Sequence, residues 1–286
     1  MTKFSRWFIA AVVSLCAVGA AYLFWSQQHG STPAPAPVAA TPPVDAAPRA
    51  LPPAPVAPPA ILHPVEAMQA PVNETAVLPS LDESDKFVTQ ALTGLLGRGA
   101  VLSFLNLDQV VRAAVATVDN LGRDHAASRL WPVLPTPGRF LVLQRGDGTY
   151  MADGNTERYA RFVGFVTSVD AGRAAALYRQ LYPLLQQAYE QLGYPGKYFN
   201  DRLITVIDQL LDTPEPSGPL KLTLTQVQGP IPATRPWVRY EFADPALESR
   251  PAGQKMLLRT GLANERRLKA KMAEFRTYIA TGGVTP

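Results

Sequence analysis

The chain has 286 residues, of which 47% are hydrophobic and 17% charged, and its formal net charge is +4. Its single cysteine, Cys16, excludes an internal disulfide and a thiolate metal cluster. No metal is expected, because the chain has no His/Cys cluster and no acidic loop with calcium-site spacing, and no cofactor is expected, because Gly94, Gly97 and Gly99 follow a predicted helix rather than a strand. The positive charge belongs to the C-terminal segment, because residues 80–249 carry 16 Lys/Arg against 18 Asp/Glu whereas residues 250–286 carry 8 against 2.

Residues 7–25 form a run of nineteen residues without a charged side chain. At about 1.5 Å per residue such a helix spans the hydrocarbon core of a bilayer, which is about 30 Å thick. Lys3 and Arg6 precede the run, so the positive-inside rule predicts a cytoplasmic tail over residues 1–6 and a periplasmic location for the rest of the chain. A cleaved signal peptide is the alternative, but the apolar run continues to Trp25 and favours an uncleaved anchor in a bacterial inner membrane.

Residues 26–79 are rich in alanine and proline, and 14 of the 28 prolines lie between Ser31 and Pro79. The segment lacks the periodic apolar face of a helix or strand. Because proline fixes φ and donates no backbone hydrogen bond, we expect a disordered, extended tether that holds the following domain away from the membrane. A polyproline ligand for a groove in a partner is the alternative interpretation.

Residues 80–286 are predicted to form one periplasmic, mainly helical domain. Apolar residues recur with helical spacing, and Asn155 and Asp170 are expected to cap two of the helices. Pro183 is expected to kink the longest helix and Gly193 to close it. The predicted helices cover residues 82–96, 107–121, 155–169, 170–192, 200–211, 252–260 and 262–280.

Three short segments of the domain are predicted to be strands. Residues 140–143 indicate a buried strand that ends at the turn Arg145-Gly146-Asp147-Gly148. Alternating patterns over residues 220–225 and 238–242 favour an antiparallel pair that packs on the helices. The predicted fold class is therefore mainly α (α+β), a helical domain with a small antiparallel sheet, preceded by one transmembrane helix and a disordered proline-rich tether.

Several motifs occur in a fixed order along this domain. They are Val118-Asp119-Asn120-Leu121, Asn155-Thr156-Glu157-Arg158-Tyr159, Leu192-Gly193-Tyr194-Pro195, Phe242-Ala243-Asp244-Pro245 with Glu248, and Gln254-Lys255 through Arg259-Thr260-Gly261. Their order and spacing resemble an uncharacterised bacterial envelope family, domain of unknown function 3014. The resemblance covers most of residues 80–280 and implies one continuous domain, but it implies no activity, ligand or catalytic residue.

Four residues are candidates for binding an anion. Arg158, beside Tyr159, has a planar guanidinium that fits a carboxylate or phosphate, although the arginine could equally pair with an acid such as Asp119 while the tyrosine packs in the core. Lys255 and Arg259 lie one helical turn apart and could form an anion-binding patch, or serve as a solvated face or ion-pair partners.

Signatures of nucleophilic catalysis are missing, since the chain has no G-x-S-x-G motif and His125 is its one histidine after residue 80. Paired carboxylates that cleave a glycan remain open, with acids such as Glu157 and Asp244 as candidates by residue type, together with Glu190 and Glu248. The basic residues between Arg266 and Arg276 oppose an apolar stripe, so they are expected on the outer face of a packed helix.

These observations predict a membrane-anchored interaction or scaffold protein of the bacterial cell envelope, for which no catalytic activity is inferred. Its expected partners are the inner membrane, through residues 7–25, and an unknown envelope protein or peptidoglycan. Nucleic acid is not expected, because of the predicted compartment. The alternatives are an enzyme that acts on an envelope polymer through paired carboxylates and a periplasmic sensor of small anions.

Overall fold

The computed structural model describes residues 60–67, 77–225 and 239–280, all of them within one compact unit of the chain, residues 57–286. The membrane span predicted over residues 7–25 and most of the tether predicted over residues 26–79 lie outside the described residues. In the ranges that the structure does describe, no helix is both long enough and apolar enough to cross a membrane.

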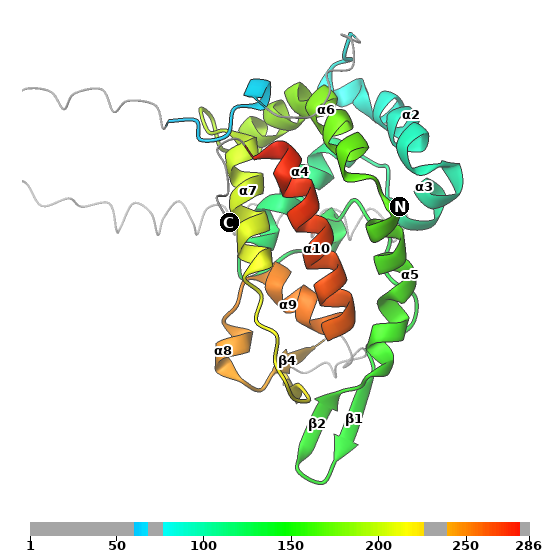
Figure 1. The fold of residues 1–286 in the computed structure, drawn as a ribbon, viewed down its shortest axis with the longest axis vertical. Helices are drawn as coiled ribbons and strands as arrows, with labels where there is room; N and C mark the ends of the chain where they lie inside the picture. Colours follow the sequence, from blue (N-terminus) through cyan, green and yellow to red (C-terminus); the bar gives the residue numbers. More distant parts are fainter. Residues whose placement is uncertain (1–59, 68–76, 226–238, 281–286) are drawn as a thin grey trace, which may run out of the picture. The chain divides into compact units, whose positions relative to one another are not determined.

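Helices make up most of the domain, as the apolar periodicity predicts (Figure 1). In chain order they are α2 (Ser84–Leu96), α3 (Arg98–Phe104), α4 (Val110–Leu121), α5 (Gly154–Ser168), α6 (Ala171–Gln191), α7 (Phe199–Leu211), α8 (Pro245–Glu248), α9 (Ala252–Arg259) and α10 (Leu262–Ile279). Short 3₁₀ helices cover Val65–Ala67, Leu81–Glu83 and Ser128–Leu130. The short helices α3 and α8 were not predicted, whereas the longer ones begin and end close to the predicted positions.

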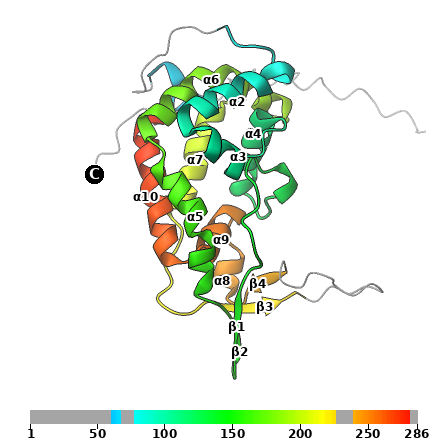
Figure 2. The ribbon, with the colours of Figure 1, turned by 90° about the vertical axis from the view of Figure 1, so that its right-hand side faces the viewer.

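A small antiparallel sheet lies at one end of the helices (Figure 2). Its strands are β1 (Val142–Arg145), β2 (Gly148–Met151), β3 (Lys221–Leu224) and β4 (Tyr240–Phe242), in the order β1-β2-β3-β4. Leu222 of β3 lies opposite both Thr149 of β2 and Phe242 of β4. The predicted pairing of the last two strands is thus confirmed, and a hairpin formed by β1 and β2 extends the sheet to four strands.

Strand β1 is not the buried strand that the sequence predicts. Its side chains are half-buried or exposed, and 45% of Leu143 is accessible to solvent. The reason is its position, because β1 is an edge strand in a hairpin that projects beyond the helices (Figure 1). An edge strand of a projecting hairpin has solvent on its outer side and on much of one face.

Helix α10 is central to the packing and lies against α5, α6 and α7 (Figure 1). The apolar stripe predicted for this helix faces inward: Leu268 and Ile279 are buried, and Met272 and Phe275 pack against the main hydrophobic cluster. Burial of a leucine or isoleucine side chain stabilises a fold by about 1.5–3 kcal/mol, so this stripe ties the C-terminal helix to the domain.

The basic side chains of α10 contact neighbouring parts of the domain. The guanidinium of Arg276 donates to both carboxylate oxygens of Asp208 in α7, at 2.5 and 3.0 Å. Arg266 Nε donates to Glu215 Oε2 at 2.8 Å, and Lys271 Nζ donates to the carbonyl oxygen of Val169 at 3.0 Å. The basic residues thus lie away from the apolar stripe, as predicted, and several of them are paired with neighbouring parts of the domain, although Arg266 and Arg267 stay exposed.

The two predicted helix caps differ in outcome. Asp170 caps α6, since its Oδ1 accepts a hydrogen bond from the backbone nitrogen of Arg173 at 2.7 Å. The prediction for Asn155 is wrong, because this residue lies inside the first turn of α5. Its fully buried amide instead accepts from Leu141 N at 3.0 Å and donates to Leu141 O at 2.7 Å, so it joins α5 to the start of the hairpin.

Residues 60–67 lie against the domain, although the sequence assigns them to the tether. The backbone nitrogens of Leu62 and His63 donate to the Asp201 carboxylate at 3.0 and 2.8 Å, and Val65 N donates to the hydroxyl of Tyr198 at 2.8 Å. The Val65 side chain is buried in the main hydrophobic cluster. The tether predicted over residues 26–79 therefore includes a segment that contacts the domain, because the backbone amides of Leu62, His63 and Val65 and the side chain of Val65 attach it there.

Asn200 connects this segment to the end of α10. Its side chain is fully buried, and its Nδ2 donates both to the carbonyl oxygen of His63, at 2.9 Å, and to that of Ile279, at 3.1 Å. Its Oδ1 accepts from the hydroxyl of Tyr178 at 3.0 Å. One amide therefore joins residues 60–67, α6 and the last turn of α10.

Candidate functional site

A groove of about 600 Å³ lies where the sheet meets the helices. It is formed by the points at which β2 leads into α5 and α9 leads into α10, with the segment before β3 along one side. Its lining residues are Leu143, Arg145, Met151, Asp153, Thr156, Glu157, residues 216–220, Leu258, residues 261–263 and Glu265. The groove thus brings together Thr156-Glu157 and Gly261, which belong to two of the motifs that resemble the envelope family.

Close packing of α5 against the start of α10 builds the floor of the groove. Gly261 has a φ of +85°, and a Cβ atom added there would overlap the side chain of Thr156. The buried Asn264 donates from Nδ2 to the carbonyl oxygen of Thr156 at 2.7 Å. The glycine is therefore required both for the backbone conformation between α9 and α10 and for the approach of α5.

Glu265 is the most unusual group in the groove, because only 1% of this acidic residue is accessible to solvent. Among the described residues its Oε1 has no hydrogen-bond donor, and Lys269 Nζ lies 3.8 Å away. Burial raises the pKa of the Glu265 carboxyl to about 7, against the opposing effect of Lys269 and with a further contribution from Glu215. Near neutral pH this carboxyl is thus close to the midpoint of its titration.

The groove carries more negative than positive groups. Asp153 and Glu157 line it together with Glu265, while Arg145 is the lining cation. The guanidinium carbon of Arg145 lies 5.0 Å from the centroid of the Tyr150 ring, so this arginine is held along the hairpin. The charge of the site therefore favours a cationic ligand over an anionic one.

Arg158 and Tyr159, predicted as binding residues, do not line the groove. Arg158 Nε donates to Pro137 O at 3.0 Å and Nη2 donates to Thr136 O at 3.0 Å, and the guanidinium carbon lies 4.7 Å from the Tyr159 ring centroid. The pairing of Arg158 with Asp119 that the sequence left open does not occur. The arginine instead holds the loop before β1, because the N–H groups of its planar guanidinium can donate to adjacent carbonyl oxygens of that loop.

Lys255 and Arg259 also have partners within the domain. Lys255 Nζ donates to Glu248 Oε1 at 2.9 Å and to Glu248 O at 3.0 Å. Arg259 donates from Nη2 to Tyr240 O at 3.0 Å and lies over the Phe242 ring, and burial lowers the pKa of its guanidinium. The two cations therefore join α9 to α8 and β4, respectively, rather than forming a shared patch.

Two further motifs meet around Asp119, which is buried. Its Oδ2 accepts from Tyr194 OH at 3.0 Å and pairs with Arg123 at 2.8 Å, and its Oδ1 accepts from Arg202 Nε at 3.0 Å. This carboxylate is fully hydrogen-bonded, as buried charges usually are, and it joins α4 to α7 and to the loop after α6. Its role is therefore structural.

The acids proposed for catalysis from the sequence do not come together. Glu157 lines the groove, whereas Asp244 caps α8 and Glu248 pairs with Lys255. Glu190 accepts a hydrogen bond from Gln186 on α6. Glu265 was not predicted as a site residue from the sequence. Its position three residues before Leu268 places it on the inward stripe of α10, and an acidic residue on an apolar stripe indicates a buried carboxyl group.

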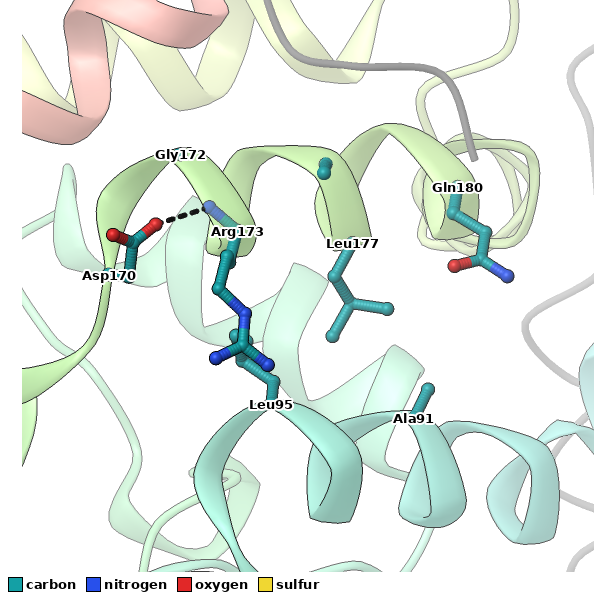
Figure 3. A pocket seen from close by; sticks show the side chains of 8 residues that line it. Ala91, Leu95, Asp170, Gly172, Arg173, Leu177 and Gln180 are labelled. Atoms are coloured by element: carbon teal, nitrogen blue, oxygen red, sulfur yellow. Dashed lines mark hydrogen bonds between the residues drawn. The ribbon is translucent and has the colours of Figure 1, made fainter. Parts of the chain in front are cut away.

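A second hollow, of about 490 Å³, lies between α2 and α6 (Figure 3). Figure 3 shows Ala91 and Leu95 on one side and Leu177 and Gln180 on the other. Arg173 Nη2 donates to the carbonyl oxygen of Gly94 at 3.3 Å across this hollow. The charged group of this hollow, Arg173, is thus already used to hold α2 against α6. The groove at the sheet is therefore the better candidate site.

In the parts of the chain that the structure describes, no group of three or more His, Cys, Asp or Glu residues is placed so that it could hold a metal ion. The fold and site define a mainly helical domain with a small sheet and an acidic groove at their junction. Residues 110–276 match the family model described as "Protein of unknown function (DUF3014)", and this range contains every residue of the groove. Because the match covers more than half of the chain, the protein belongs to this family. Comparisons with curated proteins and with solved structures gave no match.

Proposed function

We propose that the chain is a membrane-anchored interaction protein of the bacterial cell envelope, which binds an envelope protein through the groove. The location is supported by the uncharged run over residues 7–25, by Lys3 and Arg6 before it, and by the proline-rich residues 26–59 after it. In this proposal residues 7–25 span the inner membrane, and the following residues form an extended tether that carries the domain into the periplasm.

The observation that carries the binding proposal is the exposure of apolar side chains along the groove. Leu143 and Leu262 are 45% and 37% exposed, and both line the same hollow. Single exposed leucines are common on protein surfaces, but exposed apolar side chains around one concave site with a few polar groups are typical of a binding site. A partner that covers them would remove their apolar surface from water.

Site-specific photocrosslinking in native cells tests this proposal. A photoreactive amino acid replaces Leu143 in the full-length chain, and the matched control carries it in place of Leu192, which is 44% exposed at the end of α6 and does not line the groove. We expect a discrete protein adduct from position 143 that position 192 does not give. Identical adduct patterns from both positions, or an adduct with peptidoglycan instead of protein, would contradict the proposal.

One observation favours a second candidate, an enzyme that acts on an envelope polymer. Burial raises the pKa of Glu265 to about 7, and Glu265 shares the groove with the carboxyl groups of Asp153 and Glu157. Glycan cleavage uses two carboxyl groups at one site, of which the general acid has a raised pKa. The purified full-length chain would then release soluble fragments from isolated peptidoglycan, and Glu265→Gln would abolish the release. The absence of any release would remove this candidate.

A further inference from the structure

We propose that the groove binds a lysine side chain of an extended polypeptide segment, whose ammonium group donates a hydrogen bond to Glu265. The inference rests on the proposed function and names the chemistry by which the partner is recognised. It follows from the buried carboxyl group, the apolar walls and the strand edge beside the groove.

The carboxyl group supplies the recognition element. Oε1 of Glu265 is buried without a donor in the described part of the chain, and Lys269 Nζ, at 3.8 Å, is too far away to supply one. A buried polar group without a partner destabilises the fold, and a ligand that donates a hydrogen bond to it recovers that free energy. An ammonium group brings three donors and a positive charge into a site that Asp153 and Glu157 also make acidic.

The walls of the groove suit the stem of a lysine side chain. Met151, Leu220 and Leu258 line the groove beside its acidic residues. Lysine places four methylene groups before its charge, and such stems lie along apolar surfaces while the ammonium group reaches polar partners. A short cation without a stem would leave this apolar surface uncovered.

The neighbouring strand indicates that the ligand is a polypeptide. Among the described strands β1 pairs with β2 alone, and Leu143 and Arg145 of β1 line the groove. Leu141 O accepts from Ala152 N, and the alternation of an antiparallel pair then directs the backbone groups of Val142 and Gln144 away from β2. An extended segment can add to such an edge and place a side chain in the adjacent groove.

Calorimetric titration of the purified full-length chain tests the inference. The probes are the peptide acetyl-leucyl-lysyl-leucine amide and the same peptide with an Nε-acetylated lysine, which has no charge. We expect the charged peptide to bind roughly ten times more tightly, because a charge-assisted hydrogen bond is lost on acetylation. Glu265→Gln should weaken binding of the charged peptide by a similar factor, whereas Glu274→Gln, which removes an exposed acid from the same helix, should not change it.

Three results would overturn the inference: equal affinity of the two peptides, unchanged affinity in Glu265→Gln, or binding of pentylamine as tightly as the charged peptide, which would show that no polypeptide is needed. Failure of the inference is distinguishable from failure of the proposed function. Absent peptide binding together with a discrete adduct from position 143 would overturn the lysine chemistry alone, while the interaction proposal would stand.

Discussion

Glu265 shows how one residue can conflict with the packing of its own helix. The neighbouring positions on the inward face of α10, Leu268 and Met272, pack against α5, α6 or α7, and Glu265 continues that face to the start of the helix. Its carboxyl is therefore removed from water where an apolar side chain would fit. The free-energy penalty applies to the ionised form, so it depends on pH.

The pH dependence of stability has a defined sign. The pKa of the Glu265 carboxyl is about 7 in the folded domain against an ordinary value of 4.5, so the folded state binds more protons than the unfolded state. The free energy of unfolding therefore falls as pH rises from about 4.5 to about 7. The charged groups that act on this carboxyl are Lys269, Glu215 and Arg266. Asp153, Glu157 and Arg145 line the same groove.

Replacement of Glu265 by glutamine should remove this dependence. Because glutamine has no ionised form, we expect Glu265→Gln to be more stable than the wild type by on the order of 2–3 kcal/mol at pH 8 and similar to it at pH 4.5. Urea unfolding of the full-length chain at the two pH values measures the difference. Glu274→Gln is the control, and its stability should depend on pH as that of the wild type does. If Glu265→Gln loses as much free energy of unfolding between pH 4.5 and pH 8 as the wild type, the prediction is contradicted.

The sequence predicts side-chain roles well where the partner is local. The cap that Asp170 provides for α6 needs only the backbone nitrogen three residues later. Arg158, in contrast, donates to carbonyl groups about twenty residues earlier, in a loop whose path no periodicity defines. The same limit explains Asp119, whose partners Tyr194 and Arg202 come from elements far along the chain.

At the scale of elements, the junction between α9 and α10 determines the shape of the groove. Gly261 lies between the two helices with φ +85° and ψ 149°, a region that residues other than glycine rarely adopt. Gly97 joins α2 to α3 with nearly the same angles, φ +82° and ψ 146°, but nothing lies near its missing side chain. A side chain at Gly97 would therefore meet backbone strain alone, whereas a side chain at Gly261 would meet the same strain and an overlap with Thr156.

Alanine substitutions at the two glycines should differ in their effect. Gly97→Ala is expected to destabilise the domain by about 1–3 kcal/mol, through backbone strain alone. Gly261→Ala adds an overlap with Thr156 and should lower the free energy of unfolding by roughly a further 1–3 kcal/mol. Denaturant unfolding of both variants measures the difference, and equal losses would show that α5 moves aside without cost.

Element prediction succeeded where periodicity was long. The helices over 170–192 and 262–280 extend through five turns or so of repeated apolar spacing, and both occur. Strand β2 was missed because Gly148–Met151 does not alternate apolar and polar residues as the segments around β3 and β4 do, so the turn before it was interpreted as the end of a strand rather than as part of a hairpin. The groove was unpredictable because it needs the relative placement of three distant segments.

At the scale of the whole molecule, the anchor over residues 7–25 and the tether stay predictions, while the single continuous domain agrees with the family match.

An alkaline phosphatase fusion tests the predicted location of the domain in the periplasm. Because residues 60–67 already contact the domain, the enzyme is best fused after Pro59, where we expect activity, with a fusion after Arg6 as the inactive control. A stably produced but silent fusion after Pro59 would contradict the proposed topology.

The attachment of residues 60–67 has a mechanical consequence. Tension along the chain before Ala60 would load the hydrogen bonds to Asp201 first, and then Asn200, which also holds the end of α10 through Ile279. The groove lies at the opposite end of α10, around Glu265. If the proposed function holds, a pulling force from the tether would enter the domain at one end of α10, while the proposed partner would bind at the other.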